Sequence, residues 1–166
     1  VYAVGVGLVL ASLIFMKKMG DLTAMQSKVV PLDVADELNM PWSDEVKLPG
    51  RLKEEVFIKR LEGPLFFGYT ADFQMLSEQI PDTATTVIIR MEKVPYMDQS
   101  GLYAMEEVLL ELRRRNVKIL MDHLQQQPKV MMENIDIIPD LVPEEYIFDT
   151  FKETMVYVNA NVKDVV

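Results

Sequence analysis

The stretch "VPYMDQSGLYAMEEVLLELRRRNVKIL" (Val94–Leu120) decides the fold, because it connects two strand-like segments through one helix. Directly before it stands "TTVIIRM" (Thr85–Met91), a continuous apolar run rich in β-branched residues. Such a run is typical of a central strand that is covered on both faces. "VKILMDH" (Val117–His123) supplies the next strand. A strand, a helix and a second strand in this order predict a parallel pair and an α/β fold.

The helix of this unit is predicted over residues 100–115. Its apolar residues recur on one face at the spacing of an amphipathic helix, and they are Leu102, Met105, Leu109 and Leu112. The run "RRRN" (Arg113–Asn116) then places positive charge at the C-terminal end, where the helix dipole favours it. Three arginines could also bind an anion, but a capped and solvated helix end is the preferred interpretation.

The remaining patterns extend the alternation of strands and helices on both sides of this unit. A half-buried strand over 55–63 and a short strand in "GPLFFGYT" precede it, followed by a helix over 71–80 with Thr70 as N-cap. After it come a helix beginning near Pro128, a short strand "YIF", and a last helix that begins with a Thr150–Glu153 capping box. The predicted fold is α/β, a mixed, partly parallel sheet with about four helices in the order β-β-α-β-α-β-α-β-α.

Composition limits the classes of function. The chain has 166 residues and a formal net charge of −9, which suits one globular domain plus an appendage and disfavours nucleic acid as a partner. The chain has no cysteine, so disulfides, thiolate catalysis and zinc–thiolate sites are excluded. No cofactor-binding motif is present, and we expect neither a cofactor nor a metal.

The first residues differ physically from the rest. "VYAVGVGLVLASLIFM" (Val1–Met16) carries no charge and is followed at once by Lys17 and Lys18. As a helix it would rise about 24 Å, less than the ~30 Å of a bilayer core. We therefore predict that residues 1–19 are the C-terminal part of a transmembrane helix, with the residues after Met19 on the cytoplasmic side. The alternative is a buried core helix.

Residues 20–52 are predicted to be a linker, 53–160 a folded cytosolic domain and 161–166 a tail. Three prolines and several acids punctuate the linker. Asp33, Asp36 and Glu37 are close enough in sequence to suggest a metal site. No other ligand pattern accompanies them, so a solvated acidic turn is the preferred interpretation.

Asp98, Gln99, Ser100 and Gly101 form the candidate site, because they occupy the loop at the carboxyl end of a predicted parallel strand. Ser100 has three interpretations. It is an N-cap of the following helix, or a nucleophile with His123 and Asp98, or a phosphorylation site at a helix N-terminus. The nucleophile interpretation is weak because "QSGL" lacks the G-x-S-x-G elbow, and no catalytic residue is predicted.

Three segments, in the right order, resemble one family. "YMDQSGLYAMEEVLLELRRRNVKIL" is similar to the signature of the STAS domain, the sulfate transporter and anti-sigma factor antagonist fold. "VFIKRLEGPLFFGYTADF" resembles the transporter branch of that family, and "AVGVGLVLASLIFMKKMGDLT" resembles the end of the last membrane helix of sulfate permease transporters. Ser100 falls on the serine that is phosphorylated in the antagonists.

The resemblance implies a regulatory and assembly domain of a secondary anion transporter, without catalytic activity. It implies the cytoplasmic face of the inner (plasma) membrane as location, and a homodimer as assembly. The implied partners are the rest of the transporter's membrane domain, the membrane itself through residues 1–19, and a cytosolic regulatory protein or kinase. The alternative is a free-standing anti-sigma factor antagonist controlled by serine phosphorylation, which would have no use for Val1–Met16.

Overall fold

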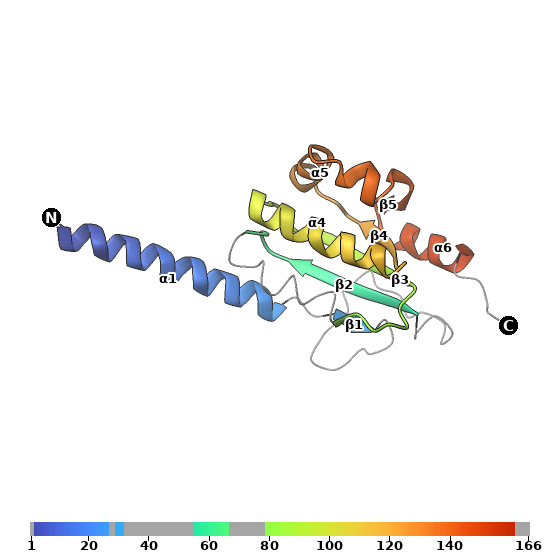
Figure 1. Cartoon of the computed structure of the whole chain (residues 1–166), viewed down its shortest axis with the longest axis horizontal. Coiled ribbons are helices and arrows are strands. Elements are labelled where there is room, and N and C mark those ends of the chain that lie inside the picture. The colour runs from blue at the N-terminus through green and yellow to red at the C-terminus, as the bar shows by residue number, and fades with distance from the viewer. Residues whose placement is uncertain (1, 27–28, 32–54, 67–78, 162–166) are drawn as a thin grey trace.

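A computed structural model describes residues 2–26, 29–31, 55–66 and 79–161, with side chains in the first of these ranges described for residues 2–17. A long N-terminal helix projects from an α/β unit (Figure 1). The elements are α1 (Tyr2–Gln26), β1 (Val29–Pro31), β2 (Val56–Glu62), β3 (Thr86–Lys93), α4 (Gln99–Arg114), β4 (Lys118–Asp122), α5 (Gln126–Glu133), a π-helical turn (Ile137–Leu141), a 3₁₀ turn (Glu144–Tyr146), β5 (Ile147–Phe148) and α6 (Phe151–Asn161).

One sheet organises the α/β unit. Its five strands lie in the order β1-β2-β3-β4-β5. β2 to β5 are parallel, and β1 pairs antiparallel with β2. The mixed, largely parallel α/β sheet predicted from the sequence is confirmed. β3 is the central strand, and its first six residues are buried, as its β-branched run predicted.

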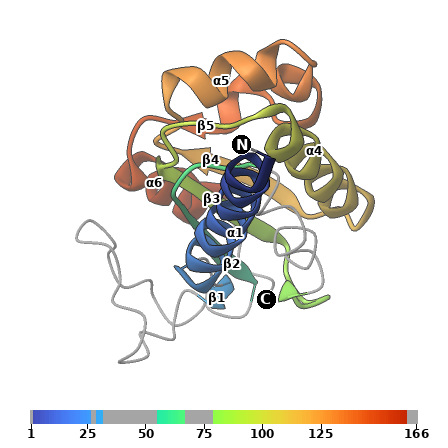
Figure 2. The ribbon, with the colours of Figure 1, turned by 90° about the vertical axis from the view of Figure 1, so that its left-hand side faces the viewer.

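Helices cover both faces of the sheet (Figure 2). The larger core lies on the α4 side and includes Val87, Ile89 and Met91 of β3 against the apolar stripe of α4. The smaller core lies on the α6 side, where Ile88 packs with Phe151. Alternate residues of one strand therefore serve the two cores, as the period of a strand requires. All four residues of the predicted α4 stripe are buried.

Two strand predictions need correction. β2 was expected to be half-buried, but Phe57 and Lys59 are buried together with the alternate residues, because both faces of β2 are covered. The strand expected in "GPLFFGYT" is reduced, in its described part, to an isolated bridge between Leu65 and Met97. Residues 67–78, with the expected Thr70 cap and most of the 71–80 helix, lie outside the described residues.

The N-terminal third also differs from expectation. α1 continues to Gln26, seven residues beyond the predicted end of the membrane segment. Val29–Pro31, placed in the 20–52 linker by the sequence, forms an edge strand of the sheet. Among the described residues, no helix is both long enough and apolar enough to cross a membrane.

Helix ends follow the sequence signals. Thr150 and Glu153 form the predicted capping box, in which each backbone N–H donates to the other's side chain at 3.2 Å. α4 ends with Asn116 in the left-handed region (φ 57°), while the Val117 N–H donates to the Leu112 carbonyl at 2.9 Å.

The arginine run at this end binds neighbouring loops. Arg113 donates to the Asp140 carbonyl at 2.7 Å, and Arg115 donates to the Ile80 carbonyl at 2.8 Å and to the Asp82 carboxylate at 3.1 Å. These contacts support a structural role for the run, in keeping with the preferred interpretation.

Candidate functional site

The loop between β3 and α4 is held by backbone pairing with the segment after β2. Leu65 donates from its N–H to the Tyr96 carbonyl and accepts from the Asp98 N–H, both at 2.9 Å. Gly63 donates to the Lys93 carbonyl at 2.8 Å. These bonds continue the β2–β3 pairing past the end of the strands, so the loop has a fixed path up to the first residue before α4.

A side chain from α5 holds the same loop from its other edge. The Gln127 side chain accepts from the Met97 N–H at 2.8 Å and donates to the Met97 carbonyl at 2.9 Å. Gln125 donates to the carbonyl of Glu92, the second-to-last residue of β3. We call Gln125 and Gln127 the glutamine clip. Because the clip holds the end of β3 at Glu92 and the loop at Met97, we infer that the position of the α4 N-terminus depends on the β4–α5 turn.

Asp98, and not Ser100, is the N-cap of α4. Its Oδ1 accepts from the Gly101 N–H at 2.8 Å, and its backbone is extended (φ −91°, ψ 178°). Ser100 is the second residue of the helix. The prediction of Ser100 as N-cap is therefore wrong. Asp and Ser are equally good caps, and here the helix begins two residues earlier than the serine would allow.

Gly101 is a packing residue. A β-carbon at this position would lie 2.6 Å from the Leu65 carbonyl oxygen and 2.9 Å from the Leu65 β-carbon. Any larger residue would push α4 away from the strand pairing described above. The D-x-S-G stretch thus combines a helix cap at Asp98 with a close approach of Gly101 to the backbone of Leu65. These two contacts fix the position of Ser100, which lies between them in sequence.

Ser100 is half-buried, and none of the described residues forms a hydrogen bond with its hydroxyl. Gln99 beside it is exposed and donates from Nε2 to the Tyr103 hydroxyl at 3.1 Å. Tyr96 and Tyr103 are each about half exposed. Ser100 therefore lies in the first turn of α4, three residues before the exposed Tyr103, at a helix N-terminus whose amides favour negative charge.

A buried charged group lies at the carboxyl ends of β3 and β4. Arg90 and Asp122 are opposite each other in the parallel register, and both are fully buried. Arg90 Nε donates to Asp122 Oδ1 at 3.2 Å, and its guanidinium carbon lies 4.6 Å from the centre of the Phe151 ring. The same Oδ1 lies 2.9 Å from His123 Nδ1. Burial raises the pKa of the Asp122 carboxyl, an effect that the neighbouring Arg90 guanidinium opposes.

The described contacts do not bring together the nominal triad of Ser100, His123 and Asp98. Asp98 is committed to the α4 cap, whereas His123 is paired with Asp122. A serine nucleophile needs its base and the orienting carboxylate in one chain of contacts, and the described contacts do not connect Ser100, His123 and Asp98. No cluster of three metal-ligating side chains occurs in the described ranges, and Asp33, Asp36 and Glu37 lie outside them.

Sequence reasoning overlooked Arg90, Asp122 and the glutamine clip. Arg90 was read as part of an apolar strand, although a cation in the middle of such a run signals a buried partner. Asp122 stands at the end of the neighbouring predicted strand and was the available carboxylate. The clip had no comparable signal, because a run of three glutamines does not reveal which backbone atoms it will reach.

The sequence and the fold were compared with those of known proteins. Residues 50–154 match the STAS domain family. Over 154 residues, 92% of this chain, the sequence is 26% identical to the protein named "Putative sulfate transporter YvdB" of Bacillus subtilis (strain 168), and it spans 26% of that relative's length.

Two solved structures share the fold. The STAS domain of a SulP transporter from Vibrio cholerae is 25% identical, with a TM-score of 0.58 over 69% of this chain and 86% of that one. The anti-sigma factor antagonist SpoIIAA in its unphosphorylated form is 18% identical, with a TM-score of 0.53 over 66% of this chain and 93% of that one. The family match covers well over half of the sequence, and the chain belongs to the STAS domain family.

Proposed function

We propose that this chain is the cytoplasmic STAS portion of a sulfate-type secondary anion transporter in the inner (plasma) membrane. In this proposal residues 1–19 are the end of the last transmembrane helix and 53–160 are the regulatory and assembly domain, with 20–52 connecting them and 161–166 as a tail. The observation that carries the proposal is that similarity to YvdB covers 92% of the chain. It must therefore include part of the apolar segment in addition to the STAS domain.

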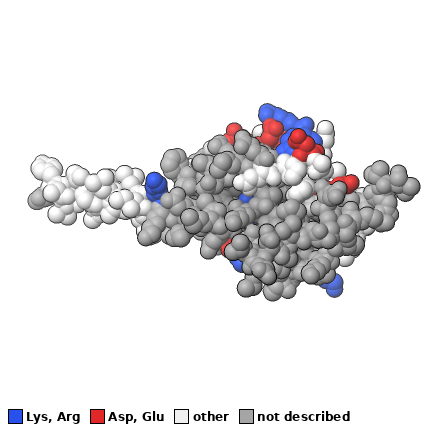
Figure 3. Space-filling model, turned by 90° about the horizontal axis from the view of Figure 1, so that it is seen from below, with Lys and Arg blue, Asp and Glu red and all other residues white. Residues whose placement is uncertain are grey.

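The surface of α1 supports attachment to a membrane. From Tyr2 to Met16 every side chain is exposed, including ten large hydrophobic ones. This part of α1 is the white surface at the end of the molecule in Figure 3. Monomeric soluble proteins seldom expose so large a continuous apolar surface to water. A buried core helix, the alternative, would have its apolar side chains covered.

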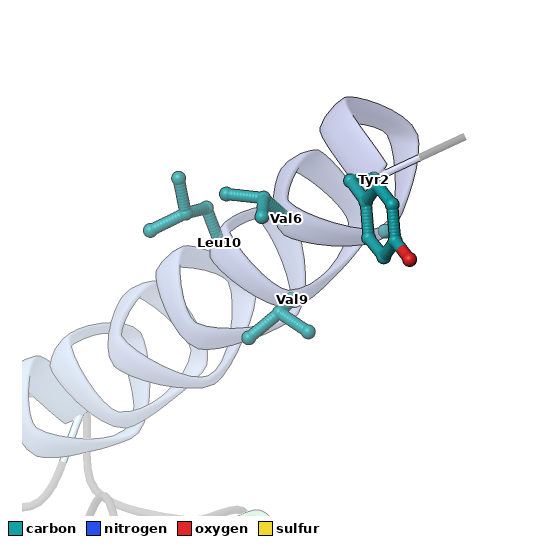
Figure 4. A pocket seen from close by; sticks show the side chains of 5 residues that line it. Tyr2, Val6, Val9 and Leu10 are labelled. Carbon is teal, nitrogen blue, oxygen red and sulfur yellow. The ribbon is translucent and has the colours of Figure 1, made fainter.

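One side of this helix also has the form of a helix-packing surface. A shallow apolar groove is lined by Tyr2, Gly5, Val6, Val9 and Leu10 (Figure 4). A β-carbon at Gly5, in the floor of this groove, would meet no atom within 4 Å. Small residues permit close approach of a neighbouring helix in lipid. This supports the rest of the transporter's membrane domain as the partner of α1.

The domain is proposed to regulate transport and not to catalyse. Asp98 caps α4 and His123 is paired with Asp122, which leaves Ser100 without a base among the described contacts. Ser100 is instead a control point, because a phosphate there would add up to two negative charges at the N-terminus of α4, one turn from the exposed Tyr103. Its partner would be a cytosolic regulatory protein or a kinase, and the transporter is proposed to be a homodimer.

A free-standing anti-sigma factor antagonist is the second candidate. The likeness to SpoIIAA favours it at the level of fold. The exposed apolar half of α1 argues against it, because an antagonist acting in the cytosol would carry that surface in water.

Uptake of radiolabelled sulfate by the full transporter tests the function. We expect uptake in cells that express it and a change of several-fold on Ser100→Asp. Asn159→Asp is the matched control, because it adds the same charge at an exposed position of α6. Absence of anion uptake would disprove the transporter assignment, whereas equal uptake by both variants would disprove the role of Ser100 alone.

A further inference from the structure

The direction of the first elements shows which edge of the sheet lies on the side of α1. α1 ends at Gln26, β1 begins at Val29, and β1 pairs antiparallel with β2. Figure 1 shows that α1 and β2 run in opposite directions, with the arrowhead of β2 on the side from which α1 projects. The carboxyl end of β2 therefore points toward the apolar half of α1.

β3 and β4 bring the candidate site to the same edge. Both strands are parallel to β2, and the three are paired in register, so their carboxyl ends also lie on the side of α1. The loop that joins β3 to α4 follows one of these ends, and the turn between β4 and α5 follows the other. We call residues 93–100 and 123–126 the carboxyl edge. Figure 2 views the molecule from this side.

The carboxyl edge reaches back toward the level of Lys17, where the uncharged surface of α1 ends. From Lys17 to Gln26, α1 extends about 14 Å along its axis. Val29 is then opposite Lys59, and β2 continues from there to Glu62, about 10 Å in the reverse direction. α1 also contacts β2 directly. The carboxyl edge is therefore the edge of the sheet nearer to the apolar half of α1.

The exposed side chains of this edge suit a lipid–water interface. Tyr96 is 52% exposed in the loop, and tyrosine is enriched where a membrane meets water. Pro95 beside it and Gln99 at the start of α4 are exposed and uncharged. This part of the surface thus combines an amphipathic ring with neutral neighbours.

Three acidic side chains of the same region are engaged by partners. They are Glu62 with Lys93 at 2.8 Å, Glu92 with Arg90 at 3.4 Å, and Asp98 with the N–H of Gly101 at 2.8 Å. Each negative charge is thus offset by a cation or by a helix N-terminus. This weakens the repulsion that anionic headgroups exert on acidic side chains.

We propose that the carboxyl edge lies against the cytoplasmic surface of the membrane, with the Tyr96 ring at the level of the lipid headgroups. The inference rests on the proposed membrane attachment of α1 and adds which face of the domain meets the lipid. Ser100 lies in the first turn of α4, within this edge. A phosphate on Ser100 would bring up to two negative charges toward anionic headgroups, which would repel it. Phosphorylation would then move the carboxyl edge away from the membrane, while α1 stays anchored.

Quenching of a single fluorescent label tests the orientation, because the chain has no cysteine of its own. Gln99 and Arg114 are the first and last residues of α4, both are exposed, and they lie about 22 Å apart along its axis. The label is attached to Gln99→Cys or to Arg114→Cys in the 166-residue chain, in nanodiscs of phosphatidylcholine and phosphatidylglycerol. Phosphatidylcholine with a nitroxide on its headgroup is the quencher. We expect several-fold stronger quenching of the label at Gln99→Cys than of the label at Arg114→Cys.

Ser100→Asp tests the repulsion of a charge at this edge. We expect it to weaken the quenching at Gln99→Cys in nanodiscs that contain phosphatidylglycerol, but not in nanodiscs of phosphatidylcholine alone. Asn159→Asp adds the same charge at an exposed position of α6 and should leave the quenching unchanged. An equal response to both substitutions would overturn the proposed effect of the phosphate.

The orientation and the membrane attachment can fail separately. Equal quenching of the two labels, or stronger quenching at Arg114→Cys, in chains that have entered the nanodiscs would overturn the orientation and leave the attachment of α1 intact. A chain that does not co-elute with the nanodiscs would overturn the proposed attachment, and the orientation with it.

Discussion

At the scale of single residues, neighbouring positions of the D-x-S-G stretch have different structural roles at the start of α4. Asp98 satisfies a free helix amide, Gly101 allows α4 to approach Leu65, and Ser100 between them is not used by either contact. Asp98 and Gly101 thus carry the structural tasks of these four residues, and the regulatory role that we propose falls on Ser100.

Gly101→Ala should destabilise the fold. Its β-carbon would meet backbone atoms of Leu65 at 2.6 and 2.8 Å, and backbone cannot move aside as a flexible side chain can. We expect a loss of about 1–3 kcal/mol in the free energy of unfolding, the usual cost of overpacking. Ser100→Ala is the matched control and should stay within about 0.5 kcal/mol, since Ser100 is not the cap. Urea denaturation measures both, and equal losses would contradict the assignment of the cap to Asp98.

Asp122 should give stability a defined pH dependence. Burial raises the pKa of its carboxyl, so the native chain binds this proton more tightly than the unfolded chain does. The stability that the bound proton contributes is fully present below the unfolded-state pKa. It is lost as the pH rises through the higher native pKa.

In the Asp122→Asn variant the side chain cannot lose a proton, so the variant lacks this pH-dependent contribution to stability. The stability of the variant relative to the wild type should therefore rise as the pH increases from the ordinary pKa of an aspartate carboxyl towards neutrality. Thermal unfolding across this range measures the difference, with Asp149→Asn as an exposed control. A difference that stays constant with pH would mean that Asp122 titrates alike in the folded and unfolded chains.

At the scale of elements, the α4 N-terminus is positioned by the chain before it and by the chain after it. The segment Gly63–Leu65 pairs with the loop through the backbone, and α5 reaches it through the glutamine clip. Gln127 makes two hydrogen bonds with one residue, Met97, which itself is buried. The loop is thus closed between two elements that are far apart in sequence.

Gln127→Ala should loosen this loop. It removes the partners of both the N–H and the carbonyl of Met97, and unpaired buried backbone groups are costly. We expect a loss of about 1–3 kcal/mol and faster hydrogen exchange at the Met97 amide. Gln126→Ala is the control, because Gln126 is exposed on the same turn and should change stability by no more than about 0.5 kcal/mol. Equal exchange rates at Met97 in the two variants would show that the clip does not hold the loop.

Elements with a strong local sequence pattern could be predicted from the sequence. Elements that form only through pairing with a distant segment could not. The β-branched run of β3, the apolar stripe of α4 and the Thr150–Glu153 box each contain their own signal, and each is confirmed. β1 has only three residues, too few for a period of two to appear, and it is a strand because β2 offers a free edge.

The candidate site was predicted in position and only partly in detail. The carboxyl end of a parallel strand correctly located the Ser100 loop. The N-cap was misassigned because Asp98 and Ser100 carry the same local preference, and only the hydrogen bond from the Gly101 N–H to Asp98 Oδ1 identifies the cap. Arg90, Asp122 and His123 meet through strand register, which a single strand's pattern does not contain.

At the scale of the whole molecule, a short chain connects an apolar helix to a charged α/β domain. α1 ends at Gln26 and β1 begins at Val29, so two residues separate the helix from the edge of the sheet. Residues 1–30 carry a charge of +2, and the remaining residues carry −11. A membrane attracts the first part through its apolar surface and basic end, while its anionic headgroups repel the second.

Truncation should therefore separate the two behaviours. The 166-residue chain should require detergent, because its exposed side chains from Tyr2 to Met16 would otherwise associate. A fragment of residues 27–166 should remain in solution after ultracentrifugation. It keeps β1 and so covers the edge of β2, which a fragment of 53–166 would leave open. We expect the shorter fragment to unfold at a lower urea concentration than 27–166. If the 166-residue chain stays monomeric in buffer without detergent, by light scattering, then α1 is not a membrane segment, and the STAS domain must be attached to its partner in another way.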